Sequence, residues 1–162
     1  RNTDGMNTRT GVPHGDVARH RVQLDAELRH HRCAVARWAL ENGRPLNIDA
    51  ITVILAARHA EAAIERRAAT RWTTRTVLTF FFGSVEQWCT QAGVTVPDHL
   101  GESLHTYLQF LSAHGVLASG SSSIAELSSS VRHISGLTAA GFAVSKSAAV
   151  EPTRLPVRAR RR

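Results

Sequence analysis

The sequence predicts an all-α protein, a bundle of about five helices with an N-terminal helical hairpin and a basic C-terminal tail. Apolar residues recur at steps of three and four along most of the chain, and a glycine or a proline follows most of these runs. No segment alternates apolar and polar residues as a half-buried strand would. The 162 residues, of which 43% are hydrophobic, are enough to bury a sizeable core.

Two helices are expected in the first half of the chain. The first covers residues 16–42, with Asp16 as its N-cap and Gly43 behind it, and the second runs from near Asn47 to about Thr70. The apolar stripe of the second helix fades into alanine, which keeps helix propensity and allows close packing. The stripe of the first comprises Val17, Leu24, Leu28, His31, Val35 and Trp38. Together the two helices are expected to form an antiparallel hairpin or a dimerising arm.

Three more helices are expected in the second half, each followed by a glycine, at positions 93, 115 and 136. The first of them starts near Thr74 and is the best candidate for the core helix. The second has Asp98 as its N-cap. The third begins with a capping box, because a hydroxyl at Ser123 and a carboxylate at Glu126 can satisfy each other's free amides. The expected inward stripe of the first comprises Leu78, Phe81, Val85, Trp88 and Ala92.

These elements divide the chain into four parts. Residues 1–15 are expected to be a mobile leader, and residues 16–70 the helical hairpin or arm. Residues 71–145 form the main helical bundle, and residues 146–162 a basic tail or linker.

Positive charge is concentrated at both ends of the sequence. Twenty basic residues, nineteen of them arginine, stand against 13 acidic ones, for a formal net charge of +7. Residues 1–75 and residues 146–162 each carry +5, whereas residues 76–145 carry −3. Basic ends of this kind attract polyanions, and nucleic acid is the commonest polyanion inside cells. The alternative is a tail that only keeps the protein soluble.

The composition argues against secreted and membrane-spanning proteins. With two cysteines, Cys33 and Cys89, a disulfide framework is excluded and a reducing, cytoplasmic location is indicated. The longest nearly apolar run, from Val77 to Gly83, is far shorter than the ~20 residues that a membrane helix needs. We therefore expect a cytoplasmic protein with no membrane partner.

Motifs for catalysis are missing from the sequence. Glu102 and His105 could supply two metal ligands from one helix, but a helical di-iron site needs a matching second pair, which the sequence lacks. Nucleophile motifs and phosphate-binding glycine loops are also missing. Packing roles suit His31, Cys89 and Tyr107, which lie on or beside the helical stripes. We expect no enzyme activity, no metal, no cofactor and no small-molecule substrate.

Short motifs follow one another in a defined order from about Thr74 to Arg162. A helix that opens on threonine ends in Trp-Cys, a helix with a Tyr-Leu pair follows, and a Ser-Ile start leads into a helix with Arg-His. The basic run 157–162 comes last. The motifs are Thr74-Arg75-Thr76, Val85-Glu-Gln-Trp88-Cys89, Gly93, Pro97, Glu102, Tyr107-Leu108, Phe110-Leu111, Ser123-Ile124, Leu127, Val131-Arg132-His133-Ile134 and Ala140-Gly141.

This order resembles the N-terminal core-binding domain of tyrosine recombinases and phage integrases, and the tail resembles the basic linker that precedes their catalytic domain. Leu78 stands where that family usually has an aromatic residue, and Ser128–Ser130 replace basic positions. The sequence contains no His-x-x-Arg motif, and Tyr107 does not match the family's nucleophile. The resemblance implies a four-helix orthogonal bundle that packs on one side of duplex DNA and cannot cut it.

Double-stranded DNA is the partner that this resemblance implies. Its phosphates would be neutralised by basic side chains, with Arg132 approaching a base edge, and the hairpin would add a dimerisation arm or a second DNA contact. The competing interpretation is a helical protein–protein interaction or oligomerisation module, including a homodimer through the N-terminal helices. The implied DNA contacts are Arg75, Arg132, Lys146, Arg154, Arg158, Arg160, Arg161 and Arg162.

Overall fold

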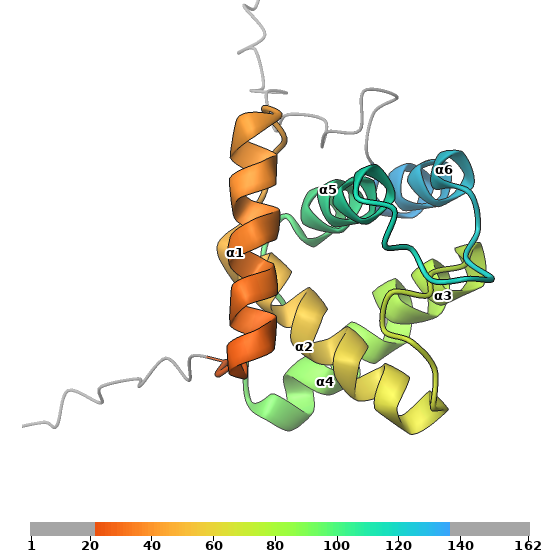
Figure 1. Ribbon diagram of the computed structural model, residues 1–162. Helices are drawn as coiled ribbons and strands as arrows, with labels where there is room; N and C mark the ends of the chain where they lie inside the picture. Colours follow the sequence, from red (N-terminus) through yellow and green to blue (C-terminus); the bar gives the residue numbers. More distant parts are fainter. Residues whose placement is uncertain (1–21, 137–162) are drawn as a thin grey trace, which may run out of the picture.

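The structure, a computed structural model, describes residues 22–136, which form a bundle of helices without strands (Figure 1). The predicted leader and basic tail lie outside these residues. The all-α prediction is confirmed. The helices are α1 (Ala26–Glu41), α2 (Ile48–Glu65), α3 (Thr74–Thr79), α4 (Val85–Ala92), α5 (Leu100–Ala113) and α6 (Ile124–Ser135), with a π-helical turn η1 (Phe80–Ser84) between α3 and α4.

Side-chain caps fix the starts of the first two helices. The Asp25 carboxylate accepts the N–H of Leu28 at 2.8 Å, and the Asn47 side chain accepts the N–H of Ala50 at 2.9 Å. Asn47 is the predicted start of α2. Residues 22–25 are not helical, so α1 begins at Ala26 with Asp25 as its N-cap, and the predicted cap Asp16 lies outside the described residues.

Helix α2 ends earlier than its sequence suggests. It ends at Glu65 rather than near Thr70, because Arg66 adopts a left-handed backbone with φ of 53°. The N–H of Arg67 then turns back onto the carbonyl of Ala62 at 3.0 Å. Glycine usually fills such a position, and no glycine marks it here. The predicted boundary was therefore wrong.

The predicted third helix corresponds to α3, η1 and α4, which follow one another as one continuous helix. Thr73 caps its start by accepting the N–H of Thr76 at 3.1 Å, and Gly93 ends it with φ of 69°. Within the π turn, the N–H of Val85 reaches the carbonyl of Phe80, five residues back.

The π turn changes which residues of this continuous helix face the core. Leu78 is 43% exposed, so its place in the predicted stripe was wrong, whereas Val85 of that stripe is buried and Phe81 and Trp88 pack against the core. A π turn adds one residue to a helical turn, so a period of 3.6 cannot describe the buried face on both sides of it. The buried face steps by three, five and four residues, through Val77, Phe80, Val85 and Cys89.

The last two helices begin in different ways. His99 precedes α5 with a left-handed backbone and no side-chain cap, so the predicted Asp98 cap was wrong. The capping box of α6 is confirmed: the Ser123 hydroxyl accepts the N–H of Glu126, and the Glu126 carboxylate accepts the N–H of Ser123 at 3.0 Å. The backbone N–H of Ser123, and also its hydroxyl at 2.9 Å, donate to the Glu126 carboxylate and hold the pKa of Glu126 below its usual range. Gly136 ends α6, as predicted.

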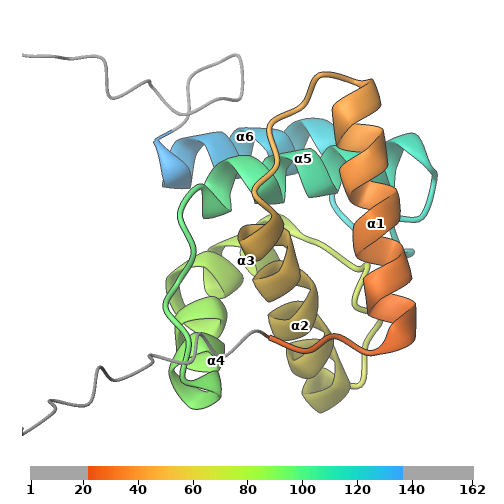
Figure 2. The ribbon, with the colours of Figure 1, turned by 90° about the vertical axis from the view of Figure 1, so that its left-hand side faces the viewer.

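Helix α2 lies at the centre of the bundle (Figure 2). Nine of its 18 residues are buried, and it packs against α1, α4 and α5. One hydrophobic cluster runs from Leu24 on the N-terminal side to Val131 on α6. The ranges 16–70 and 71–145, which the sequence analysis separates, therefore contribute to a single core over the described residues.

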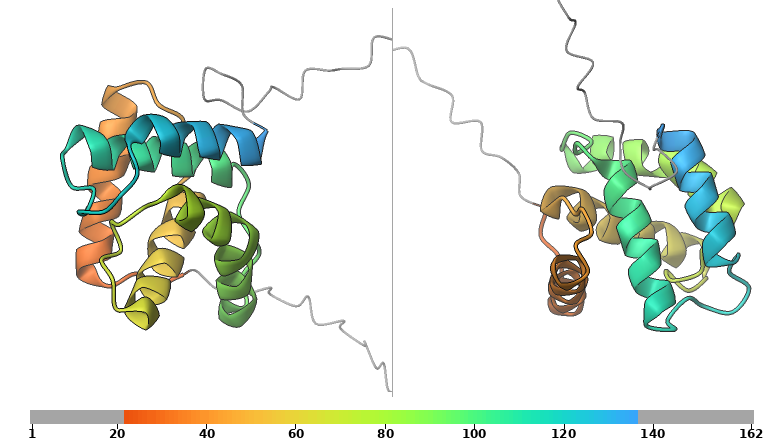
Figure 3. Two further views of the ribbon diagram at one scale, coloured as in Figure 1. Left: turned by 90° about the vertical axis from the view of Figure 1, so that its right-hand side faces the viewer. Right: turned by 90° about the horizontal axis from the view of Figure 1, so that it is seen from above.

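Helices α3 and α6 lie side by side (Figure 3). Their first residues are close together, since the N–H of Thr74 donates to the Ser122 hydroxyl at 3.2 Å. At the other end α6 approaches α5 so closely that a Cβ on Gly101 would lie 2.4 Å from the Cβ of Ser135 and 3.7 Å from the ring of Phe81. Glycine is thus required where α5 and α6 meet.

Candidate nucleic-acid interface

Two of the predicted DNA contacts lie within the described residues. Arg75 is exposed in the first turn of α3, and Arg132 is half-buried in the last turn of α6. The other six lie outside residues 22–136: Lys146, Arg154, Arg158, Arg160, Arg161 and Arg162.

These two arginines lie at different ends of the α3 and α6 pair. Arg75 directly follows Thr74, which contacts Ser122 just before α6 begins. Arg132 lies eight residues after the first residue of α6, roughly 12 Å further along the helix axis. The structure therefore does not bring Arg75 and Arg132 into one compact site.

The positive charge of Arg132 acts on a buried histidine of α5. His105 is 4% exposed, and its Nε2 has no hydrogen-bond partner in the described part of the chain. Burial, followed by the charges of Arg132 and Arg44, lowers the pKa of His105. Arg132 thus influences the interior of the bundle as well as its surface.

The described bundle carries no net formal charge, because ten arginines are matched by ten acidic residues over residues 22–136. All seven excess positive charges of the chain belong to residues 1–21 and 137–162. The arginines of the bundle are unevenly placed, however. Residues 58–75 contain five arginines and two glutamates.

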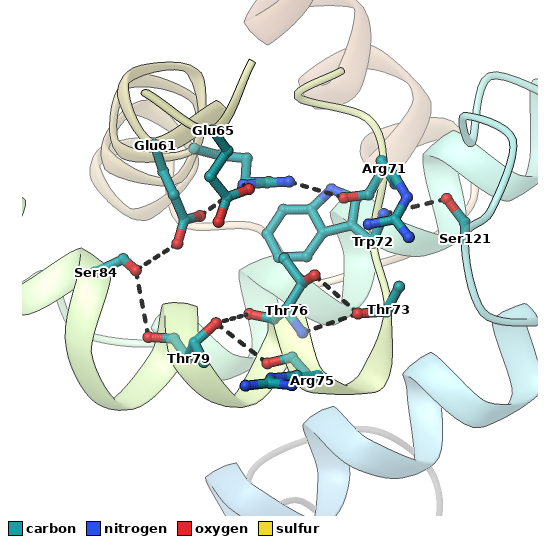
Figure 4. A network of polar contacts seen from close by, with 11 residues as sticks. Glu61, Glu65, Arg71, Trp72, Thr73, Arg75, Thr76, Thr79, Ser84 and Ser121 are labelled. Carbon is teal, nitrogen blue, oxygen red and sulfur yellow. Dashed lines mark hydrogen bonds and ion pairs between the residues drawn. The ribbon is translucent and has the colours of Figure 1, made fainter. Parts of the chain in front are cut away.

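One of these five arginines, Arg58, is buried, and it belongs to a polar network whose other members include Glu61, Glu65, Arg71 and Ser84 (Figure 4). Its guanidinium donates to the Glu61 carboxylate at 2.7 Å, lies 3.7 Å from the Glu65 carboxylate, and donates to the carbonyl of Arg71 at 2.9 Å. The Ser84 hydroxyl of η1 donates to the other oxygen of Glu61 at 2.6 Å. The network therefore joins α2, the segment after it, and the π turn.

The segment between α2 and α3 is also tied to the loop before α6. Trp72 is fully buried, and its backbone N–H donates to the Ser121 hydroxyl at 3.1 Å. Two further backbone hydrogen bonds join the segments, from the N–H of Ser122 to the Trp72 carbonyl at 2.9 Å and from Ala118 to Thr70 at 3.1 Å. This segment is thus held in place along its length.

Residues 66–75, which we call the arginine link, carry four arginines. Arg66, Arg67 and Arg75 are exposed, and Arg71 is half-buried. None of the four forms an ion pair with another described residue. Of these four, only Arg75 was predicted from the sequence as a DNA contact, although four arginines without an acidic residue in ten positions were a signal for the other three.

Cys89, Tyr107 and His31, which were predicted to pack, lie wholly or partly inside the bundle. Cys89 is buried, and burial raises the pKa of its thiol. Tyr107 is buried, which raises the pKa of its hydroxyl, and that hydroxyl lies 3.3 Å from Nε2 of the half-buried His31. Over residues 22–136, no three His, Cys, Asp or Glu side chains are grouped so that they could hold a metal ion.

An exposed apolar patch lies on the π turn. Phe82 is 65% exposed and Leu78 43%, one helical turn apart. A shallow hollow beside them is lined by Leu78, Thr79, Phe82, Gly83, Ser84 and Gln87. Both side chains are available to a partner molecule, so this patch is an apolar alternative to the arginine link.

Comparison with protein-family models, curated proteins and solved structures finds no match to this chain. Within residues 22–136, none of the helices has the length and apolar character needed to cross a bilayer.

Proposed function

We propose that this chain is a non-catalytic DNA-binding protein of the cytoplasm that contacts the phosphates of double-stranded DNA. The observation that carries the proposal is the distribution of charge, since all of the excess positive charge flanks a neutral helical bundle. The ordered motifs that resemble a recombinase core-binding domain also support it. Duplex DNA carries dense negative charge, and its neutralisation by arginines releases bound counterions.

Arginine suits this role because its planar guanidinium can contact two phosphate oxygens at once. In the proposed complex the tail arginines from Arg154 to Arg162 neutralise phosphates, and Arg75 contributes from the bundle. Contacts to phosphate set the position of a protein on the duplex but do not read sequence. Binding with little dependence on DNA sequence is therefore expected, apart from any base contact by Arg132.

The test compares the full chain with a chain that ends at Ala149, which lacks five arginines. Affinity for a generic DNA duplex is measured at several salt concentrations. Since each phosphate contact contributes about 0.9 to the slope of log affinity against log salt, the truncation should reduce the slope by up to about 4.5. A full-length chain with glutamine at those five positions is the matched control, and it should behave like the truncation.

Two results would overturn the proposal. One is no binding by the full chain even at low salt. The other is binding that does not weaken as salt increases, because contacts to phosphate are always sensitive to salt.

A second candidate is a helical interaction or oligomerisation module, which the exposed apolar side chains favour. Phe82 and Leu78 lie together on η1 and α3, and Leu40 on α1 is 84% exposed. Apolar association of helices barely changes with salt. Sedimentation of the full chain over a range of concentrations at two salt concentrations would therefore separate this function from DNA binding.

A further inference from the structure

We propose that the arginine link is a second phosphate-contacting surface, which docks the folded bundle itself onto duplex DNA. This inference rests on the proposed function. It adds Arg66, Arg67 and Arg71 to Arg75, and it assigns the link, rather than the bundle as a whole, to the DNA.

The first argument is the uneven distribution of charged residues in a bundle that has no net charge. Residues 58–75 have three more arginines than acidic residues, and the rest of residues 22–136 has three fewer. A polyanion that approaches the bundle is therefore attracted to the arginine link and repelled elsewhere.

The second argument concerns the acidic residues nearest to the link. Glu61 and Glu65 would be expected to pair with the exposed arginines and cancel their charge. Glu61 instead accepts hydrogen bonds from the buried guanidinium of Arg58 and from Ser84, and Glu65 lies 3.7 Å from the same guanidinium. The link arginines consequently keep their charge available for an external anion.

The third argument is that the backbone of the link is fixed before binding. Arg66 is held at a left-handed helix end, and Trp72 anchors the segment in the core. The Arg71 side chain lies against the loop before α6, since a Cβ on Gly120 would be 3.1 Å from Nε of Arg71. A preorganised surface loses less conformational entropy on binding, so more of the electrostatic attraction appears as affinity.

The experiment uses two full-length variants with the same net charge. R66Q/R67Q/R75Q removes three exposed arginines from the link. R29Q/R37Q/R44Q is the matched control, which removes three exposed arginines from α1 and the segment after it. In the described residues, the side chains of these six arginines form no hydrogen bond or ion pair that folding would lose.

Binding to a generic DNA duplex is measured for both variants over a range of salt. If each link arginine neutralises one phosphate, R66Q/R67Q/R75Q reduces the slope of log affinity against log salt by about 2.7. The control should reduce it by less than about 1, because those arginines act only at a distance. Circular dichroism and thermal unfolding establish that both variants keep the wild-type fold.

Equal slopes for the two variants would overturn the inference while leaving the proposed function intact, since net charge alone would then explain binding. Tighter binding of single-stranded than of duplex DNA would also overturn it. No binding by the wild-type chain is a different result, because it contradicts the proposed function itself.

Discussion

The guanidinium of Arg58 lies over the ring of Trp72, with 5.2 Å between its central carbon and the ring centroid. Both side chains are buried, at 2% and 0% exposure. A cation placed over an indole ring is attracted by its π electrons, and this attraction strengthens when water is excluded. Because Arg58 also holds Glu61 and the carbonyl of Arg71, this pair couples the end of α2 to the arginine link.

Replacing Arg58 with methionine should strongly destabilise the fold. The substitution leaves the partly buried carboxylate of Glu61 without its cation, and the carbonyl of Arg71 without its donor. Removal of one partner from a buried ion pair costs about 3–5 kcal/mol in the free energy of unfolding. Urea denaturation measures this loss. Arg37→Met on the exposed face of α1 is the control and should stay within about 0.5 kcal/mol of wild type.

A loss below about 1 kcal/mol in Arg58→Met would show that the network contributes little to stability. The double variant R58M/E61Q provides a second check. It removes both charges, so it should be more stable than Arg58→Met alone.

Alanine substitutions at two glycines should have opposite effects. Gly101→Ala places a methyl group 2.4 Å from the Cβ of Ser135, where α5 and α6 meet, and should cost about 1–3 kcal/mol of stability. Gly83→Ala meets nothing within 4 Å and has no positive φ, so it should stabilise the helix by about 0.5–1 kcal/mol. Thermal unfolding of the two variants measures both effects. A neutral Gly101→Ala would mean that α5 and α6 are not in close contact.

Acidification should destabilise the protein through His105. In the folded state, burial and then Arg132 and Arg44 lower the pKa of His105, whereas an unfolded chain gives histidine its ordinary pKa of about 6.5. Below about pH 6.5 the unfolded state therefore binds more protons, and stability falls with pH until the folded-state pKa is passed. Denaturant unfolding at several pH values follows this loss.

The variant His105→Gln should have a weaker pH dependence than wild type between about pH 6.5 and 5. Some dependence should remain, because burial also lowers the pKa of His31. His133→Gln, at an exposed position on α6, is the control. An unchanged pH profile in His105→Gln would contradict the assignment to His105.

Local signals in the sequence predicted much of the fold. Asn47, Ser123 and Glu126 mark helix starts through hydrogen bonds within four residues, and Gly93 and Gly136 mark helix ends through their left-handed backbone. The sequence contained no comparable signal where other residue types fill these positions. Arg66 and His99 adopt left-handed backbones although neither is glycine, so residue type does not mark these two positions in the sequence.

The candidate site was less predictable than the fold. Arg75 was identified from the sequence, but the fixed position of the segment that it shares with Arg66, Arg67 and Arg71 depends on Trp72 and on the loop before α6. Those contacts join residues almost fifty positions apart, which periodicity cannot reveal. Arg58 is a similar case: it lies in the alanine-rich part of a helix, and only the structure shows that it is buried.

The phase of the π turn gives the last prediction. Phe80 is fully buried against Trp72, with ring centroids 5.4 Å apart, whereas Phe82 is 65% exposed. Phe80→Ala should therefore cost about 3–5 kcal/mol of unfolding free energy, because it removes a core ring and leaves a cavity. Phe82→Ala, the matched control within the same turn, should stay within about 0.5 kcal/mol of wild type. Urea denaturation of the two variants measures both costs. Equal costs would contradict the different burial of the Phe80 and Phe82 rings.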